Sequence, residues 1–343
     1  MLRSAVRLAR TGLGRTALAG AAHARYRARR EWRNMARDDI DETPRTSYGV
    51  VLDPDWNRVM VRTEHPADGS AVFTVPAADE ALSSNVIVLL HGLGNDGSMF
   101  GPIMSSLASV GTVVAPTMSA DLLTDVGDER ASMSSKLIAW LSAVAPPPWN
   151  LVGHSMGGVM TGLVLRTRPE LVRCTVLLNS PVPGVIHRIR FRDTVDRTGR
   201  ALMFMKALAA VTRFGRPRLP GFLRGPEIAA VRLALRGFVH DPGGLDPRVL
   251  SRAILGSRTS DGNDFLRLAE GLPAWEAEPF DSVPVSIVLG DSDPLIPIPD
   301  IDAVVDMYPA ATIHVFANCG HFAHLEWSPL TVDTITEFLT APH

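Results

Sequence analysis

Cysteine, lysine and long apolar runs are scarce in this 343-residue chain. Its two cysteines, Cys174 and Cys319, are too few for a disulfide framework, and we expect them to be buried or loop thiols. No apolar run reaches the roughly 18 residues that a membrane-spanning helix needs. The chain also has no His, Cys and Asp cluster with metal-ligand spacing and no G-x-G-x-x-G after a strand. We therefore expect neither a metal nor an organic cofactor.

The chain does have enough apolar material for a large core. Hydrophobic residues make up 46% of it, and its formal net charge is −2. Such a length suits one large domain with an insertion, and the near-neutral charge gives no reason to expect a nucleic-acid partner. Buried strands alternate with helical segments, which predicts an α/β fold: a mostly parallel, eight-stranded sheet with helices on both faces. Segments 48–52, 59–61 and 71–75 are expected to form its antiparallel edge.

Acidic residues are missing from the first 30 positions, which hold eight arginines. The remaining 313 residues then carry 26 basic and 36 acidic side chains, a net charge of −10. An Arg-rich, acid-free start is typical of mitochondrial transit peptides, but it also suits a basic arm on an anionic membrane. Only two of the 34 Lys and Arg residues are lysine, so the arginine bias belongs to the whole chain. We expect residues 1–40 to be a basic extension of a cytoplasmic or peripheral membrane protein, with mitochondrial targeting left open.

The strongest signal for function lies at residues 153–158. The apolar run 149–152 comes before it, and a helical pattern with Val159, Met160 and Leu163 follows. A strand, then G-x-S-x-G, then a helix is the context of a nucleophile elbow, in which a strained turn lifts the serine hydroxyl above the sheet. Ser155 is therefore the candidate nucleophile, and the alternative is a glycine-rich turn with a solvated serine.

A second glycine-rich turn follows an earlier strand. The apolar run 86–90 predicts a fully buried parallel strand that leads into His91-Gly92-Leu93-Gly94. A loop with few side chains can aim backbone N–H groups at a developing oxyanion. The two donors predicted here are the amides of Leu93 and of Met156, the residue after the nucleophile.

Two aspartates and two histidines follow the last two predicted strands. Strand 283–289 leads into Asp291 and Asp293, and Pro294 restricts the backbone of Asp293, whereas Asp291 could cap the turn. Strand 312–316 leads into His321 and His324. We expect His321, which follows a glycine, to be the base that reaches Ser155, and His324 to pack in the loop.

These motifs together resemble the α/β-hydrolase superfamily, within it the capped serine esterases and lipases. The resemblance covers residues 47 to 342 and depends on four segments in order: HGLG, GHSMGG, GDSDPLIP and GHFAHLE. It implies Ser155 as nucleophile, Asp293 as acid, His321 as base, and Leu93 and Met156 as oxyanion donors. Dehalogenases and epoxide hydrolases of this superfamily have an aspartate at the elbow, so the serine argues against both.

The resemblance also implies how the chain is divided. Residues 41–183 and 280–343 would form the core, and 184–279 a helical cap whose apolar side chains either pack together or line an acyl pocket. The D-x-x-G-x-G-x-S loop of many members is missing near residues 117–121. Some relatives place the acid after the strand that ends at Leu178, but here Asn179 follows it and no carboxylate comes before Asp193.

The predicted function is hydrolysis of a small-molecule carboxylic or lipid ester through an acyl-enzyme on Ser155. A thioesterase, a carbon–carbon hydrolase, a perhydrolase or an acyltransferase could use the same triad, because the cap and pocket select the leaving group and acceptor. A non-catalytic binding protein on this scaffold is the third alternative. The sequence leaves the acyl chain length and the oligomeric state open.

Overall fold

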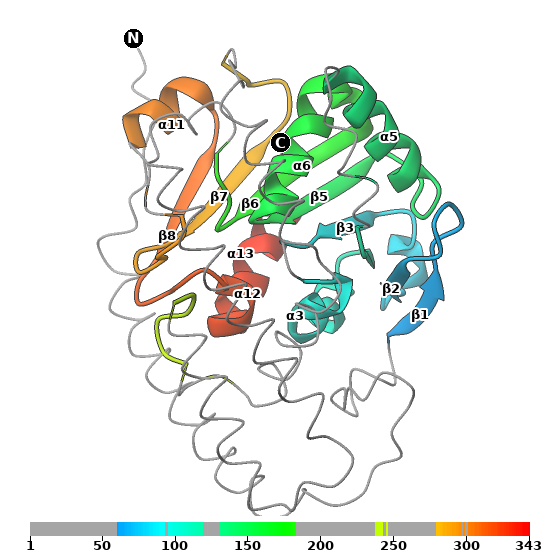
Figure 1. Ribbon diagram of the computed structural model, residues 1–343, viewed down its shortest axis with the longest axis horizontal. Helices are drawn as coiled ribbons and strands as arrows, with labels where there is room; N and C mark the ends of the chain where they lie inside the picture. The colour runs from blue at the N-terminus through cyan, green and yellow to red at the C-terminus, as the bar shows by residue number, and fades with distance from the viewer. Residues whose placement is uncertain are drawn as a thin grey trace, which may run out of the picture.

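One eight-stranded sheet forms the centre of the part of the protein that the computed structural model describes (Figure 1). The strands run in the order β1-β2-β4-β3-β5-β6-β7-β8. Their bounds are β1 Val61–Glu64, β2 Ala71–Val75, β3 Val86–Leu90, β4 Thr112–Pro116, β5 Trp149–His154, β6 Val172–Leu178, β7 Val285–Gly290 and β8 Thr312–Phe316. The pairs β1–β2 and β2–β4 are antiparallel and all others are parallel. The predicted fold class, a mostly parallel eight-stranded sheet with an antiparallel edge, is confirmed.

The described residues cover most of the predicted core. They are residues 60–92, 95–118, 122, 130–182, 237–242, 245, 279–296, 298 and 301–343. The basic extension 1–40, the predicted strand 48–52 and the donor Leu93 lie outside them. Of the predicted cap 184–279, residues 237–242, 245 and 279 are described.

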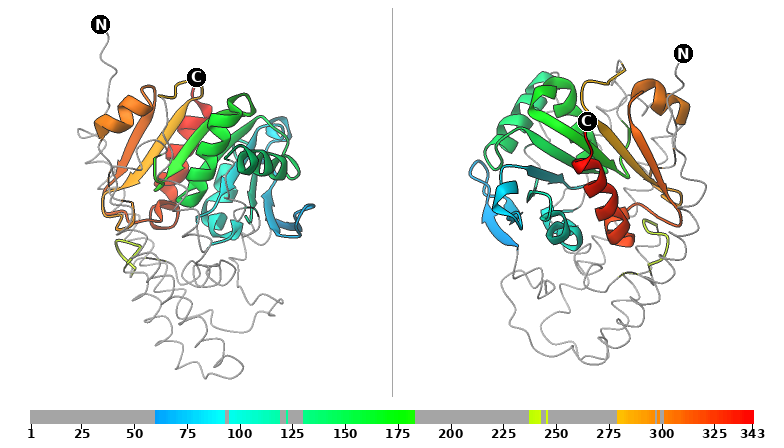
Figure 2. Two further views of the ribbon diagram at one scale, coloured as in Figure 1. Left: turned by 45° about the horizontal axis from the view of Figure 1, so that its top comes forward. Right: turned by 180° about the vertical axis from the view of Figure 1, so that it is seen from behind.

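Helices cover both faces of the sheet (Figures 1 and 2). α3 and α13 lie on one face, and α5, α6 and α11 lie on the other. The bounds are η1 Glu80–Leu82, η2 Gly97–Phe100, α3 Gly101–Leu107, α5 Arg130–Ser142, α6 Met156–Thr167, η3 Pro169–Leu171, α11 Ile301–Met307, α12 Ala323–Glu326 and α13 Ser328–Thr340. The 3-10 turn η2 leads directly into the short α-helix α3.

The central strands are apolar throughout because both of their faces are covered. All five residues of β3 are buried. Alternate side chains enter the hydrophobic cores on opposite faces of the sheet: Val88 and Leu90 pack with α6, whereas Ile87 and Leu89 pack with α3. This two-sided burial explains why the strand reads as a continuous hydrophobic run without polar alternation.

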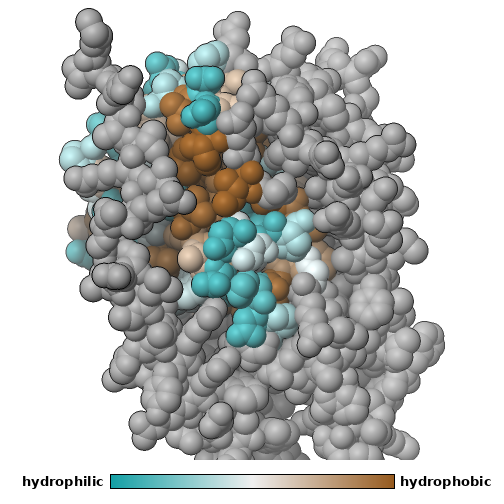
Figure 3. Space-filling view, turned by 90° about the vertical axis from the view of Figure 1, so that its left-hand side faces the viewer, coloured by the Kyte–Doolittle hydropathy of each residue, from teal (hydrophilic) through white to brown (hydrophobic). Residues whose placement is uncertain are grey.

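The outer strands are less buried than the central ones. All four residues of β1 are exposed, and Val315 of β8 is 44% exposed. Figure 3 views the side of the molecule where β8 lies and shows apolar side chains gathered in a band there. Within the residues that the structure describes, no helix has both the length and the apolar character needed to cross a membrane.

Candidate active site

The predicted site residues follow the ends of neighbouring parallel strands. Ser155 comes directly after β5, Asp293 lies in the turn after β7, and His321 lies in the loop after β8. Parallel strands present their carboxyl ends at one edge of a sheet, where α/β proteins form their sites. The order β5-β6-β7-β8 therefore brings three segments together that are far apart in the chain.

Ser155 has the strained backbone expected of a nucleophile elbow. Its φ of 53° and ψ of −119° are unusual for a residue other than glycine. The turn is tight enough to require glycine beside it: a Cβ on Gly157 would lie 2.0 Å from the carbonyl oxygen of Leu90 in β3. The missing side chain lets α6 begin directly against β3 and holds the Ser155 hydroxyl at the end of the sheet.

Ser155, His321 and Asp293 form a continuous chain of hydrogen bonds. The Ser155 hydroxyl lies 3.0 Å from His321 Nε2 and can donate to it. His321 Nδ1 lies 2.9 Å from Asp293 Oδ2. Because a carboxylate can only accept, His321 carries its proton on Nδ1 and leaves Nε2 free as an acceptor. This tautomer is the one in which an imidazole can take a proton from a serine.

The two candidate aspartates have different surroundings. The Asp293 side chain is fully buried, and its Oδ1 accepts hydrogen bonds from the backbone N–H groups of Leu295 and Ile296, both at 2.9 Å. Asp291 is exposed, and its Oδ1 accepts from the Ser292 hydroxyl at 2.8 Å and the Cys319 N–H at 3.3 Å. Asp291 therefore stabilises the turn by hydrogen bonds, the capping role that the sequence allowed for it. Asp293 instead contacts the imidazole of His321.

The loop that carries His321 is held by groups from several elements. The His321 N–H donates to the carbonyl oxygen of Phe238 at 2.6 Å, and its carbonyl oxygen accepts from His154 Nε2 at 2.8 Å. Glu326 accepts from the N–H groups of Gly320 at 3.1 Å and His240 at 2.8 Å. Burial raises the pKa of Glu326, although these N–H donors favour the ionised form. The described segment of the predicted cap thus contacts the backbone of the candidate base directly.

One of the two predicted oxyanion donors can be placed. Met156 is the first residue of α6, so its N–H is among the four at a helix start without an intrahelical partner. Leu93 lies outside the described residues, but its neighbours in the loop are anchored. His91 donates from Nδ1 to the Gly92 carbonyl at 2.8 Å and accepts from the Met118 N–H at 2.9 Å.

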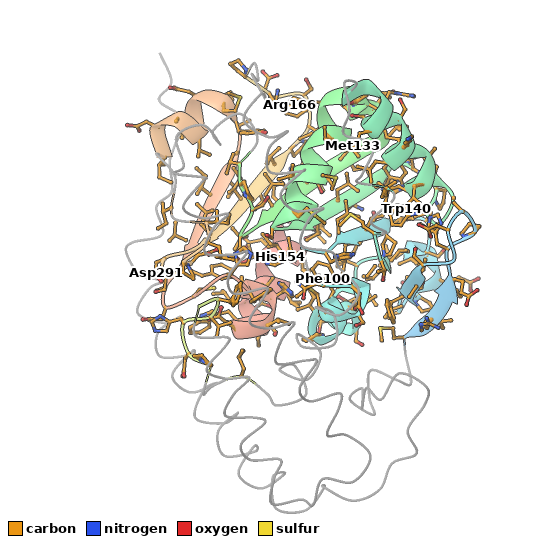
Figure 4. All side chains as sticks on the ribbon, viewed as in Figure 1. Phe100, Met133, Trp140, His154, Arg166 and Asp291 are labelled. Atoms are coloured by element: carbon orange, nitrogen blue, oxygen red, sulfur yellow. The ribbon has the colours of Figure 1, made fainter. Side chains whose placement is uncertain are left out.

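Two further buried histidines, His154 and His324, pack beside the candidate base. Figure 4 labels His154, whose ring centroid lies 4.7 Å from that of His324 and 4.9 Å from that of His321. Neither ring nitrogen of His324 has a hydrogen-bond partner among the described residues. Burial lowers the pKa of His324 to about 3. Burial also lowers the pKa of His154 far below its ordinary value, and the other two imidazoles add to this effect. His324 therefore packs as a neutral ring in the short helix α12, not in a loop as the sequence predicted.

A comparison to known families covers the part of the chain that carries these motifs. A family model described as the alpha/beta hydrolase family matches residues 87–333. The chain belongs to the alpha/beta hydrolase family.

Relatives of this alpha/beta hydrolase carry names that describe different substrates. Pyrrolizixenacetamide deacetylase of Xenorhabdus hominickii is 25% identical over 249 residues, which cover 70% of this chain and 85% of the relative. The 2-hydroxymuconate semialdehyde hydrolase of a Pseudomonas species is 25% identical over 264 residues, covering 74% and 86%. The structure of an esterase from Exiguobacterium antarcticum superposes with a TM-score of 0.57 at 16% identity, covering 82% of this chain and 99% of the esterase.

Three residues at this edge of the sheet were not predicted as part of the site: Asn179, His154 and Glu326. Asn179 follows β6 at the edge where the candidate acid and base meet, and its side chain contacts both of their segments. The strand order could have directed attention to it, because a polar residue at that strand end must face the neighbouring turn. Within the described part of the chain, no group of His, Cys, Asp and Glu is arranged to hold a metal ion.

The buried imidazole of His324 predicts a specific loss of stability in acid. The unfolded chain binds a proton near pH 6.5, whereas the folded protein resists protonation of His324 until about pH 3. Stability must therefore fall as the pH drops through this range, by about 1.4 kcal/mol per pH unit for this one group. In His324→Phe, we expect the free energy of unfolding, measured with urea between pH 7 and 4, to fall less steeply by that amount.

A matched substitution checks this prediction. His343→Phe removes an imidazole on the exposed C-terminal residue, and we expect it to keep the wild-type slope. An unchanged slope in His324→Phe would mean that His324 is protonated in the folded protein at mildly acidic pH.

Proposed function

We propose that this alpha/beta hydrolase cleaves carboxylic esters, lipid esters included, through an acyl-enzyme on Ser155. The observation that supports the proposal most is the hydrogen-bond chain from Ser155 through His321 to Asp293, at a strained elbow beside a helix N-terminus. A serine hydroxyl is a poor nucleophile unless a base takes its proton, and here the base is oriented by a buried carboxylate.

The proposed reaction uses each of these groups in turn. Ser155 Oγ attacks the acyl carbon while His321 Nε2 takes the hydroxyl proton. The oxyanion accepts hydrogen bonds from the N–H of Met156 and, as the sequence predicts, of Leu93. Asp293 stabilises the imidazolium. His321 returns the proton to the leaving alcohol, and a water molecule then repeats the attack and releases the acid and Ser155.

Residues 184–279 are proposed as the cap that selects the acyl group. Support comes from residues 237–242, which contact the His321 loop through the carbonyl of Phe238 and the N–H of His240. A segment bonded to the base is well placed to bring the rest of the insertion over the nucleophile. This arrangement would let cap residues define how much acyl chain enters.

The test of this function is hydrolysis of p-nitrophenyl esters from acetate to palmitate by the full-length protein. We expect turnover with an optimum at one chain length, and a pre-steady-state burst of one p-nitrophenolate per active site if deacylation is slow. A fluorophosphonate probe should label the wild-type protein stoichiometrically. A folded protein that neither reacts with the probe nor hydrolyses any acyl compound would contradict the proposal and favour a binding role.

The relatives give the competing reactions for the same assay. If this protein is a carbon–carbon hydrolase, we expect it to cleave 2-hydroxymuconate semialdehyde, the compound in the name of one relative, faster than any ester. An amidase would favour acetamides, the bond that the name of another relative describes. We expect the ester to have the highest kcat/KM of the three, because its alkoxide leaves more readily than an amine or a carbanion.

A further inference from the structure

Asn179 lies between the candidate acid and the candidate base. It follows β6, is fully buried, and has a φ of 43° that favours asparagine over most residues. Its N–H donates to the carbonyl oxygen of Val288 in β7 at 2.8 Å, so its backbone is tied to the strand that leads to Asp293.

The side-chain amide of Asn179 has three partners. Its Nδ2 donates to Asp293 Oδ2 at 3.2 Å and to the Gly320 carbonyl oxygen at 3.0 Å. Its Oδ1 accepts from the Ala323 N–H at 3.2 Å. Two of these partners can only accept and the third can only donate, so they determine which way the amide points. One side chain thus bonds to the carboxylate and to both ends of the loop that carries His321.

We propose that Asn179 is a positioning residue that sets the distance between Asp293 and His321. The inference depends on the proposed function, since it concerns the same triad. Asp293 Oδ2 receives two hydrogen bonds, from His321 Nδ1 and Asn179 Nδ2, and these two donors fix the direction in which its lone pairs point. The bonds to Gly320 and Ala323 hold the backbone on both sides of His321, which keeps its imidazole within hydrogen-bond distance of Asp293.

Only an asparagine can make this set of contacts at this position. An aspartate could accept from Ala323 but could not donate to Asp293 or Gly320, and glutamine is one methylene longer. The neighbouring residue extends the bracing to the nucleophile: the Ser180 hydroxyl donates to the Ser155 carbonyl oxygen at 2.9 Å. The turn after β6 therefore contacts the segments of all three proposed catalytic residues.

The first test is Asn179→Asp, which keeps the size, the preference for positive φ and the acceptor for Ala323. It removes both donors and places a second carboxylate about 3 Å from Asp293, where the two charges repel. A misplacement of about 1 Å costs on the order of 100-fold in rate, so we expect kcat to fall about 100-fold with KM within about threefold of wild type. The assay is the p-nitrophenyl ester of best chain length.

Asn150→Asp is the matched control. Asn150 is a buried asparagine on β5 whose Nδ2 donates to Asn85 Oδ1 at 2.7 Å and to the Val86 carbonyl at 3.0 Å. It stands at the start of β5, whereas Ser155 follows the end of that strand. We expect the control to lose stability in urea to a similar degree but to keep the wild-type kcat. Equal losses of kcat in the two variants would mean that Asn179 has a merely structural role and would overturn the proposal.

A double-mutant cycle tests whether Asn179 acts through Asp293. If it does, Asn179→Asp should change kcat far less in an Asp293→Asn background than in the wild type, because the carboxylate it positions is gone. A full 100-fold loss in both backgrounds would overturn the proposal. The ¹H NMR signal of the proton on His321 Nδ1 gives a readout that does not depend on turnover. We expect this signal to shift or broaden in Asn179→Asp and to stay unchanged in Asn150→Asp.

A second variant covers the case in which Asn179→Asp does not fold. Asn179→Gly keeps the positive φ and removes all three side-chain bonds, and we expect the same loss of kcat at a nearly constant KM. The proposal and the proposed function fail in different ways. A wild-type protein that is inactive on every acyl substrate contradicts the function, whereas an active wild type with an equally active Asn179→Gly contradicts only the positioning role.

Discussion

Replacing Ser155 by alanine is expected to lower kcat for ester hydrolysis by about 10⁵- to 10⁶-fold and to abolish fluorophosphonate labelling. Ser155 Oγ, which lies 3.0 Å from His321 Nε2, is the only non-hydrogen atom that the substitution removes. No acyl-enzyme can then form, while the remaining groups can still bind substrate and polarise it. Stopped-flow measurement of the p-nitrophenolate burst, together with gel detection of the probe, gives the result.

The fold should not change in this variant. Alanine adopts the strained elbow backbone with a cost similar to that of serine, so we expect the urea midpoint to stay near that of the wild type. Ser286→Ala is the matched control, because Ser286 is a buried serine on β7 whose hydroxyl has no partner among the described residues. It should keep both labelling and turnover. Labelling that persists in Ser155→Ala would assign the nucleophile to another residue.

Asp293→Asn is expected to lower kcat by about 10⁴-fold, because it reverses the tautomer of His321. Oδ1 of residue 293 must still accept from the N–H groups of Leu295 and Ile296, so the new amide nitrogen takes the place of Oδ2. That nitrogen donates, and His321 Nδ1 can face it only as an acceptor. Nε2 then carries the proton and cannot take one from Ser155. Activity is measured across pH 6 to 9.

Asp291→Asn is the control for the acid assignment. It removes one exposed charge but keeps an oxygen that can accept from the Cys319 N–H and the Ser292 hydroxyl. Exposed charges of this kind contribute little, so we expect kcat within about threefold of wild type. A larger loss in Asp291→Asn than in Asp293→Asn would exchange the roles of the two aspartates.

Much of this protein could be predicted from local patterns in its sequence. The apolar run 86–90 is buried on both sides, and this requirement appears in the sequence as a strand without polar residues. The elbow around Ser155 is equally local, because glycines on both sides of one serine are needed for the tight turn between β5 and α6. The eight-stranded sheet and the alpha/beta hydrolase family follow from the order of such segments.

Local patterns distinguished less well between neighbouring candidates. Asp291 and Asp293 lie in one turn, and the sequence alone offers both as the acid. Their difference comes from depth: the Asp293 side chain is buried beside His321, and Asp291 stays at the surface. His321 and His324 are both buried and differ instead in their contacts, since His321 hydrogen-bonds to Ser155 and Asp293 whereas the ring nitrogens of His324 have no partner among the described residues.

The sequence by itself determined the fold, the elbow and the set of residues from which a triad could be drawn, because strand burial and tight turns depend on a few consecutive side chains. Only the tertiary structure decided how those residues are held. Asp293 and Gly320 lie 114 and 141 positions after Asn179, yet the side-chain amide of Asn179 hydrogen-bonds to both of them. Such a contact leaves no periodicity or spacing in the chain, since it arises from the order in which β6, β7 and β8 lie side by side.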